Sequence, residues 1–144
     1  MNAPEHTAAF LFERSAQKWA DRPFLCVGPL ATRPYLPQGW EITYGEAAKV
    51  VARLRESYAR AGYGFGHRVG ILLENRPEHH LHLLALNGLG VSIVPLNPDY
   101  RADESRYAIE HSELCLIVAL PERAEAIAAV AATCVQKPGV VAIA

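Results

Sequence analysis

The chain has 144 residues, of which 51% are hydrophobic and 20% are charged, and its formal net charge at pH 7 is −1. This length and composition are typical of one folded domain with a buried core, and they exclude an intrinsically disordered chain. The near-neutral charge excludes a strongly basic surface of the kind that binds nucleic acid or acidic membranes electrostatically.

The cysteine pattern and the N-terminus indicate where the protein resides. Cys26, Cys115 and Cys134 are odd in number and show no Cys-x-x-Cys spacing. This argues against a disulfide framework or a zinc site, and each cysteine is expected to be a small buried hydrophobic residue. The N-terminus has no signal-peptide core, and no apolar run approaches the ~20 residues that a membrane span needs. We therefore expect a cytoplasmic protein.

The beginning of the chain predicts a helix followed by a hairpin. The helix is expected over about residues 8–20. Short strands are expected at residues 24–27 and 40–43, and they can pair as an antiparallel hairpin because nothing helical lies between them. The predicted inner face of the helix carries Phe12, Ser15, Ala16 and Trp19.

A long amphipathic helix is predicted next. Thr43 and Glu46 have the spacing of a capping box, in which each side chain accepts a hydrogen bond from a free main-chain N–H at the start of a helix. Gly62 ends the helix, since glycine adopts the left-handed conformation at low cost. The stripe at helical spacing comprises Tyr44, Ala47, Ala48, Val51, Leu54, Tyr58 and Ala61.

From Arg68 onward, strands and helices alternate, which predicts an α/β fold. The strands read as continuous apolar runs, as expected where both faces of a parallel sheet are covered. We expect a partial, mostly parallel sheet flanked by helices, preceded by the N-terminal helix and hairpin. The expected strands are 68–73, 91–95, 114–119 and 139–144, and the helices begin near Pro77, Ala102 and Glu122.

Two glycine clusters, residues 62–67 and 88–90, raise the possibility of a phosphate-binding loop. Such a loop needs the order strand, glycine-rich turn, helix, so that free N–H groups face the anion. Both clusters instead follow a helix and precede a strand, and neither matches a nucleotide-binding motif. We interpret them as turns that end helices.

The turns of correct polarity are "ENRPE" and "PLNPDYRADE". Because ligands gather at the carboxyl ends of parallel strands, Asn75, Asn97, Tyr100 and Arg101 are the best-placed polar residues. Acidic residues in the next helical turn would repel an anion there. We favour local hydrogen bonds from Asn75 and Asn97 to their own turns.

The stretch "EHHLH" suggests a metal site, because His79 and His82 can share a helix face with Glu78. Zinc requires three or four convergent ligands, and no second cluster follows, while His80 points away from His79. A partly solvated helix face is therefore the favoured interpretation. No serine or cysteine lies in a nucleophile-elbow motif.

Taken in order, these motifs resemble the N-terminal region of the adenylate-forming (AMP-binding) acyl-CoA synthetase family. That family shows a Thr-Tyr-x-Glu helix start, a Gly-Asp-x-Val strand entry, an Asn-x-Pro-Glu turn, a helix ending in glycine and a Pro-x-Asn strand end. The chain departs from the pattern at His67, Arg76, His79 and His80. The matching segments are Thr43-Tyr44-Gly45-Glu46, Gly66-His67-Arg68-Val69, Asn75-Arg76-Pro77-Glu78, Gly90 and Pro95-Leu96-Asn97.

The resemblance implies that residues 1–144 are the N-terminal part of the large domain, truncated before the catalytic motifs. Such enzymes convert a carboxylic acid, ATP and CoA, with Mg²⁺, to an acyl-CoA, AMP and pyrophosphate through an acyl-adenylate. Their phosphate loop ends in lysine, and none of Lys18, Lys49 and Lys137 lies in such a loop. The resemblance therefore assigns no catalytic, cofactor-binding or metal-binding residue here, and the fragment itself is expected to be inactive.

An alternative is a stand-alone, non-catalytic α/β module that binds a partner. The two interpretations differ in what they predict for the last strand, residues 139–144. In a fragment this strand is an unpaired edge that favours self-association. In a self-standing module it is protected.

Overall fold

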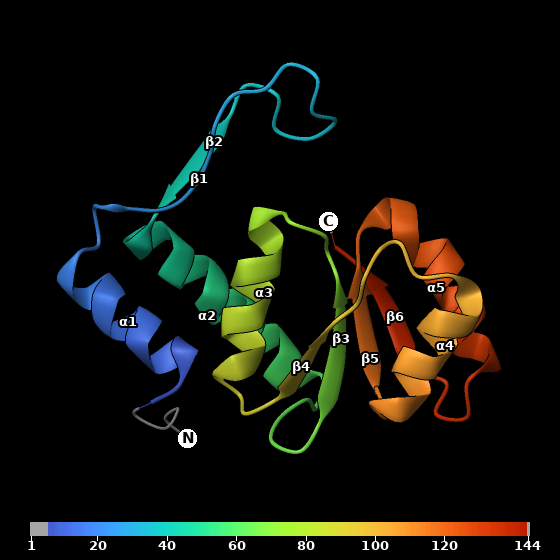
Figure 1. Cartoon of the computed structure of the whole chain (residues 1–144). Helices are drawn as coiled ribbons and strands as arrows, with labels where there is room; N and C mark the ends of the chain where they lie inside the picture. Colours follow the sequence, from blue (N-terminus) through green and yellow to red (C-terminus); the bar gives the residue numbers. More distant parts are fainter. Residues whose placement is uncertain (1–5, 144) are drawn as a thin grey trace.

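The computed structural model describes residues 6–143 (Figure 1). The helices are α1 (Ala8–Lys18), α2 (Tyr44–Arg60), α3 (Pro77–Asn87), α4 (Ala102–His111) and α5 (Pro121–Thr133). The strands are β1 (Pro23–Val27), β2 (Trp40–Thr43), β3 (Arg68–Leu72), β4 (Ser92–Pro95), β5 (Leu116–Ala119) and β6 (Gly139–Ala142). The order of elements matches the one predicted from the sequence.

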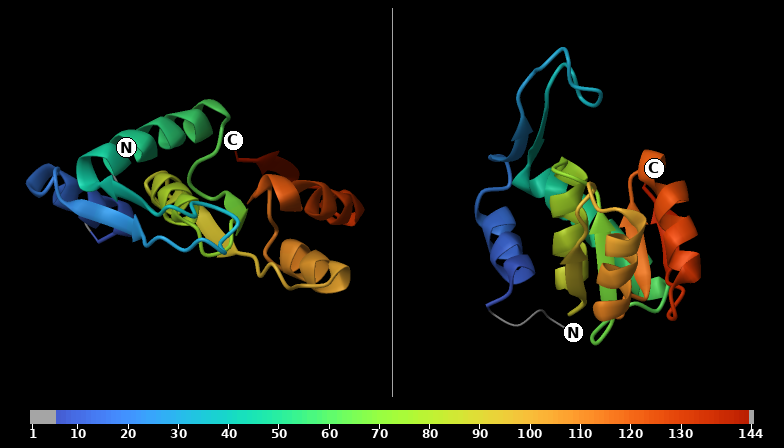
Figure 2. Two further views of the ribbon diagram at one scale, coloured as in Figure 1. Left: turned by 90° about the horizontal axis from the view of Figure 1, so that it is seen from above. Right: turned by 45° about the vertical axis from the view of Figure 1, so that its right-hand side comes forward.

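The main sheet has four parallel strands in the order β4-β3-β5-β6. In β3, Gly70 lies beside Val94 of β4 on one side and Ile117 of β5 on the other. Helices flank both faces of this sheet, as Figures 1 and 2 show. The predicted α/β fold with a parallel sheet is confirmed.

Alternate residues of the central strands face two different cores. Leu72 and Ile117 pack with α4 and α5, whereas Ile71 and Val118 belong to the cluster that contains residues of α3 and the side chain of Tyr58 from α2. Because both faces are covered, β3 and β5 need apolar residues at successive positions, which explains their unbroken hydrophobic runs.

The N-terminal region forms a third core beside α3. β1 and β2 pair as a separate antiparallel sheet, as predicted. Phe12 of α1, Phe24 of β1 and Tyr44 of α2 pack together, with ring centroids 4.8 to 6.0 Å apart. The predicted capping box is present: the N–H of Glu46 donates to Thr43 Oγ1, and the N–H of Thr43 donates to the Glu46 carboxylate. That carboxylate has a lowered pKa because it accepts hydrogen bonds from the main chain and side chain of Thr43.

Some predictions about burial are wrong. Trp19 was placed on the inner face of the first helix, but α1 ends at Lys18 and Trp19 is 40% exposed. β4 is an edge strand with no fully buried residue, so it is not the buried strand that its apolar sequence suggested. Cys26 is exposed, and its thiol donates to Glu41 on the neighbouring strand at 3.2 Å. Cys134 is buried as predicted, and Cys115 is partly buried.

Candidate functional site

β3 and β5 are neighbours in the main sheet, but the chain leaves their carboxyl ends toward opposite faces of the sheet. β3 continues into α3, which packs on one face, and the neighbouring β5 continues into α5, which packs on the other. Open parallel sheets commonly bind ligands in the crevice at such a switch point. The turn at residues 73–76, after β3, and the first residues of α5, up to residue 123, lie at this edge of the sheet.

Two crossed ion pairs occupy this crevice. Arg123 donates from Nε and Nη2 to one carboxylate oxygen of Glu74, at 3.0 and 2.9 Å. In the second pair the arginine comes from the turn after β3 and the glutamate from α5: Arg76 pairs with Glu122. The turn after β3 and the first turn of α5 thus each contribute one arginine and one glutamate, and the four charges sum to zero.

The loop between β1 and β2 reaches over the same region. The ring of Tyr35 lies on the guanidinium of Arg76, with 4.4 Å between the guanidinium carbon and the ring centroid. Its hydroxyl donates to the main-chain oxygen of Asn75 at 3.3 Å. These contacts attach the hairpin to the carboxyl edge of the main sheet.

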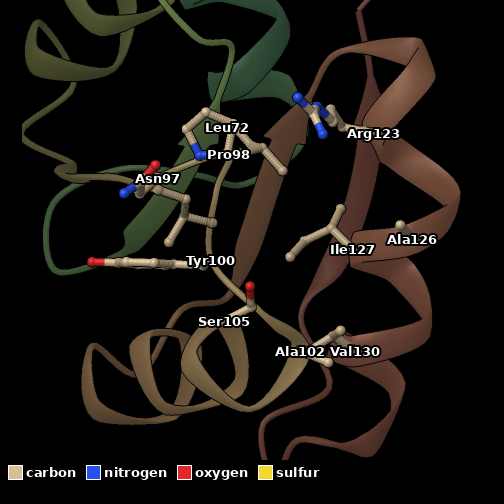
Figure 3. Close-up of a pocket in the computed structure, with 11 residues that line it drawn as sticks. Leu72, Asn97, Pro98, Tyr100, Ala102, Ser105, Arg123, Ala126, Ile127 and Val130 are labelled. Atoms are coloured by element: carbon tan, nitrogen blue, oxygen red, sulfur yellow. The ribbon is translucent and has the colours of Figure 1, made fainter.

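Beside the ion pairs, a cavity of about 220 Å³ opens between α4, α5 and the end of β3 (Figure 3). Its walls are mostly apolar, and its polar groups come from Asn97, Tyr100, Ser105 and Arg123. Ser105 is the polar residue of α4 that is buried, with 9% of its surface exposed. The cavity can therefore hold a small molecule with an apolar body.

The structure brings together only part of the set predicted from the sequence. Asn97 and Tyr100 line the cavity, and Asn97 Oδ1 accepts from the N–H of Asp99 at 3.0 Å, so the predicted local bond of Asn97 is confirmed. The same prediction for Asn75 is wrong, because its side chain makes no hydrogen bond to any residue within 6–143. Arg101 is exposed and lies outside the cavity lining, where it precedes the first turn of α4.

Sequence reasoning missed Arg123 and Glu74. The segment 119–123 also has the order strand, turn, helix, because Pro121 and Glu122 follow the apolar run directly. Charged residues at the start of a helix that directly follows a buried strand were the sequence feature that could have indicated this site. Their pairing itself required knowledge that β3 and β5 are neighbours in the sheet.

The comparisons with known proteins decide the family. A family model described as AMP-binding enzyme matches residues 12–143. The chain belongs to this family. It is 36% identical over 94 residues to a feruloyl-CoA synthase from an Amycolatopsis species, which covers 65% of this chain and 19% of that protein. It is 30% identical over 114 residues to surfactin synthase subunit 1 of Bacillus subtilis (strain 168), covering 79% of this chain and 3% of that one.

Solved structures agree with this AMP-binding assignment at the level of the fold. A long-chain-fatty-acid-CoA ligase (FadD1) from Archaeoglobus fulgidus superposes with a TM-score of 0.84 at 20% identity. The match covers 99% of this chain and 28% of the ligase. The chain spans about a fifth of the length of the feruloyl-CoA synthases that it matches.

The three histidines of α3 in this AMP-binding chain lie in three different surroundings. His82 is largely buried and its Nδ1 shares a hydrogen bond of 2.7 Å with the hydroxyl of Tyr58. Burial, followed by the charge of His79, lowers the pKa of His82 to about 4. His79 lines a hollow next to Asn75, whereas His80 is exposed. Within the described residues, no group of three or more histidine, cysteine or acidic side chains is placed to hold a metal ion.

The two glycine clusters lie at helix ends, as interpreted. Gly62 and Gly66 have φ of +88° and Gly90 has φ of +72°, conformations that suit glycine in turns. The ring of His67 bonds back to the main chain of Gly64 at 3.1 Å. Among residues 6–143, no helix is long and apolar enough to cross a membrane.

Proposed function

We propose that this chain is the N-terminal part of the large domain of an ATP-dependent acyl-CoA synthetase. The longer enzyme joins a carboxylic acid to CoA through an acyl-adenylate and releases AMP and pyrophosphate. The observation that carries the proposal is the AMP-binding match over residues 12–143 in a chain that spans 19% of its feruloyl-CoA synthase relative. A cytoplasmic location is part of the same proposal, because ATP and CoA are its substrates.

The turns of this chain explain why the chemistry is assigned to the rest of the enzyme. Phosphate binding by a helix N-terminus needs free N–H groups and no competing negative charge. Here each helix that follows a strand of the main sheet carries an acidic residue in its first turn: Glu78 in α3, Asp103 and Glu104 in α4, and Glu122 in α5.

Glu122 shows the competition directly. A hydrogen bond from its own main-chain N–H at the start of α5, and then the charge of Arg76, lower its pKa and hold it as a carboxylate. The N-terminus of α5 is thus already occupied by an anion of the protein itself. We infer that this chain alone activates no acid, and that ATP, Mg²⁺ and CoA are held by residues beyond it.

The test is acyl-CoA formation by a polypeptide extended to the length of the curated relatives. Aromatic acids such as ferulate and long-chain fatty acids, supplied with ATP, Mg²⁺ and CoA, cover the classes named in the similar proteins. The proposal predicts a thioester with at least one acid and AMP as the nucleotide product. Production of ADP, or of no thioester across the panel, would argue against it.

A further inference from the structure

The cavity between α4 and α5 is lined by one largely buried polar residue of α4, Ser105. Ser105 is 91% buried, and its N–H donates to the main-chain oxygen of Arg101 as in any helix. Its Oγ makes no hydrogen bond to any described residue. Figure 3 shows this hydroxyl pointing from α4 into the cavity.

Other helical serines in the chain behave differently. Ser15 Oγ donates to the carbonyl of Leu11 at 2.9 Å, and Ser57 Oγ donates to the carbonyl of Arg53 at 3.0 Å. This bond to the preceding turn is the ordinary solution for serine within a helix. Ser105 does not take it, although buried hydroxyls are usually hydrogen-bonded. Its hydroxyl faces the cavity and is therefore available to a molecule that enters it.

The size and walls of the cavity restrict what can occupy it. Leu72, Leu96, Ile127 and Val130 supply apolar surface around a volume of about 220 Å³. An engineered apolar cavity of ~150 Å³ in another protein binds benzene, so this volume suits one six-membered ring with a small substituent.

The charges around the cavity favour a neutral occupant. Arg123 lies at its rim, but its guanidinium is already paired with the Glu74 carboxylate. Asp103 and Glu104 follow Ala102 of the cavity wall in the first turn of α4, and their negative charge disfavours an anion nearby. A neutral hydroxyl can both donate to and accept from Ser105.

We propose that this cavity binds a small neutral aromatic molecule that carries a hydroxyl group, with the ring against Ile127 and Val130 and the hydroxyl on Ser105. Nothing in this proposal depends on the ligase function, because every residue involved belongs to this chain. It defines a second ligand site on the scaffold, apart from the acid-activation chemistry assigned to the longer enzyme.

The experiment compares phenol with toluene, a ring of the same size that lacks the hydroxyl. Methyl-resolved NMR of the 144-residue chain follows the signals of Leu72, Ile127 and Val130 during titration. The proposal predicts saturable shifts with phenol, with a dissociation constant on the order of millimolar. Ser105→Ala should weaken phenol binding by roughly threefold to tenfold and leave toluene binding unchanged.

Two further variants separate binding from folding effects. Ser57→Ala removes a hydroxyl from α2, which packs on the opposite face of the sheet, and should change neither affinity. Val130→Phe fills the cavity and should abolish the shifts from both molecules. The proposal is overturned if phenol causes no saturable shift at these methyls, or if Ser105→Ala binds phenol as well as the unaltered chain does. The proposal is also overturned if benzoate binds at least as tightly as phenol. It is overturned as well if phenol binding is lost in a longer protein because that protein's own chain fills the cavity.

Discussion

Arg123 donates two hydrogen bonds to a single carboxylate oxygen of Glu74, and this contact joins the turn after β3 to the first turn of α5. Both side chains are partly exposed, at 41% and 29%. The contact spans the switch point of the sheet, where related architectures commonly place a ligand. In this chain the protein's own charges fill that position.

Glu74→Gln is expected to lower the free energy of unfolding by about 1 kcal/mol, because it removes a charge-assisted pair of hydrogen bonds that is only partly screened by water. Urea unfolding followed by circular dichroism measures the change. As a matched control, Arg60→Gln removes the exposed pair of Arg60 with Glu56 and should cost less than about 0.5 kcal/mol. Equal changes in the free energy of unfolding for the two substitutions would mean that the pair of Arg123 and Glu74 stabilises the fold no more than an exposed ion pair does.

Gly70 is required by close packing in the central strand. A Cβ at this position would lie 2.7 Å from Leu114 Cδ1 and 3.1 Å from Leu96 Cδ1. Gly70→Ala should therefore destabilise the protein by about 1–3 kcal/mol through overpacking. Gly64→Ala is the control, since a Cβ there meets no atom within 4 Å. A neutral Gly70→Ala in the same unfolding assay would show that the two leucines can move aside.

His82 should make stability depend on pH. Its pKa is about 4 in the folded protein, against 6.5 for an unperturbed histidine, chiefly because it is buried. The unfolded chain therefore binds a proton at His82 that the folded chain does not. The stabilising contribution is complete above pH 6.5 and is lost as the pH falls toward 4, with a total on the order of 2–3 kcal/mol.

Denaturant midpoints measured from pH 7.5 to pH 4 test this dependence. His82→Gln removes the titrating group while retaining polar atoms near the hydroxyl of Tyr58, so it should flatten the curve in this window. His80→Gln alters an exposed histidine and should leave the slope in place. A slope that survives His82→Gln would assign the dependence to other groups, His79 among them.

The outer edge of β6 is expected to support self-association of the 144-residue chain. β6 pairs with β5 on one side, and Val141 is 52% exposed. Unprotected edge strands of this kind add further strands readily. Sedimentation velocity should show concentration-dependent association that Val141→Lys suppresses. A monomer at all concentrations would favour the self-standing module over the fragment.

Local patterns predicted the elements of this fold well. The capping box of Thr43 and Glu46 placed the start of α2, and the helix expected to begin near Ala102 is α4, which starts at that residue. The helix cap and the helix boundaries depend on residues that are close together in the sequence. The alternation of strands and helices after Arg68 was enough to predict a parallel sheet.

Properties that depend on strand order could not be predicted in the same way. The apolar sequence of β4 suggested a buried strand, but its place at the edge leaves it half exposed. The pairing of Glu74 with Arg123 joins residues 49 positions apart, and it arises because β5 lies beside β3. No spacing rule within either turn indicates that contact.

The most direct test of the central claim is acid-dependent exchange between ATP and labelled pyrophosphate, measured side by side for the 144-residue chain and for a polypeptide of family length. We predict exchange with the longer protein and none with the 144-residue chain, because each helix that follows a strand of its main sheet has an acidic residue in the first turn. Exchange by the 144-residue chain alone would contradict the account, and it would mean that the chain contains an ATP site at one of these turns.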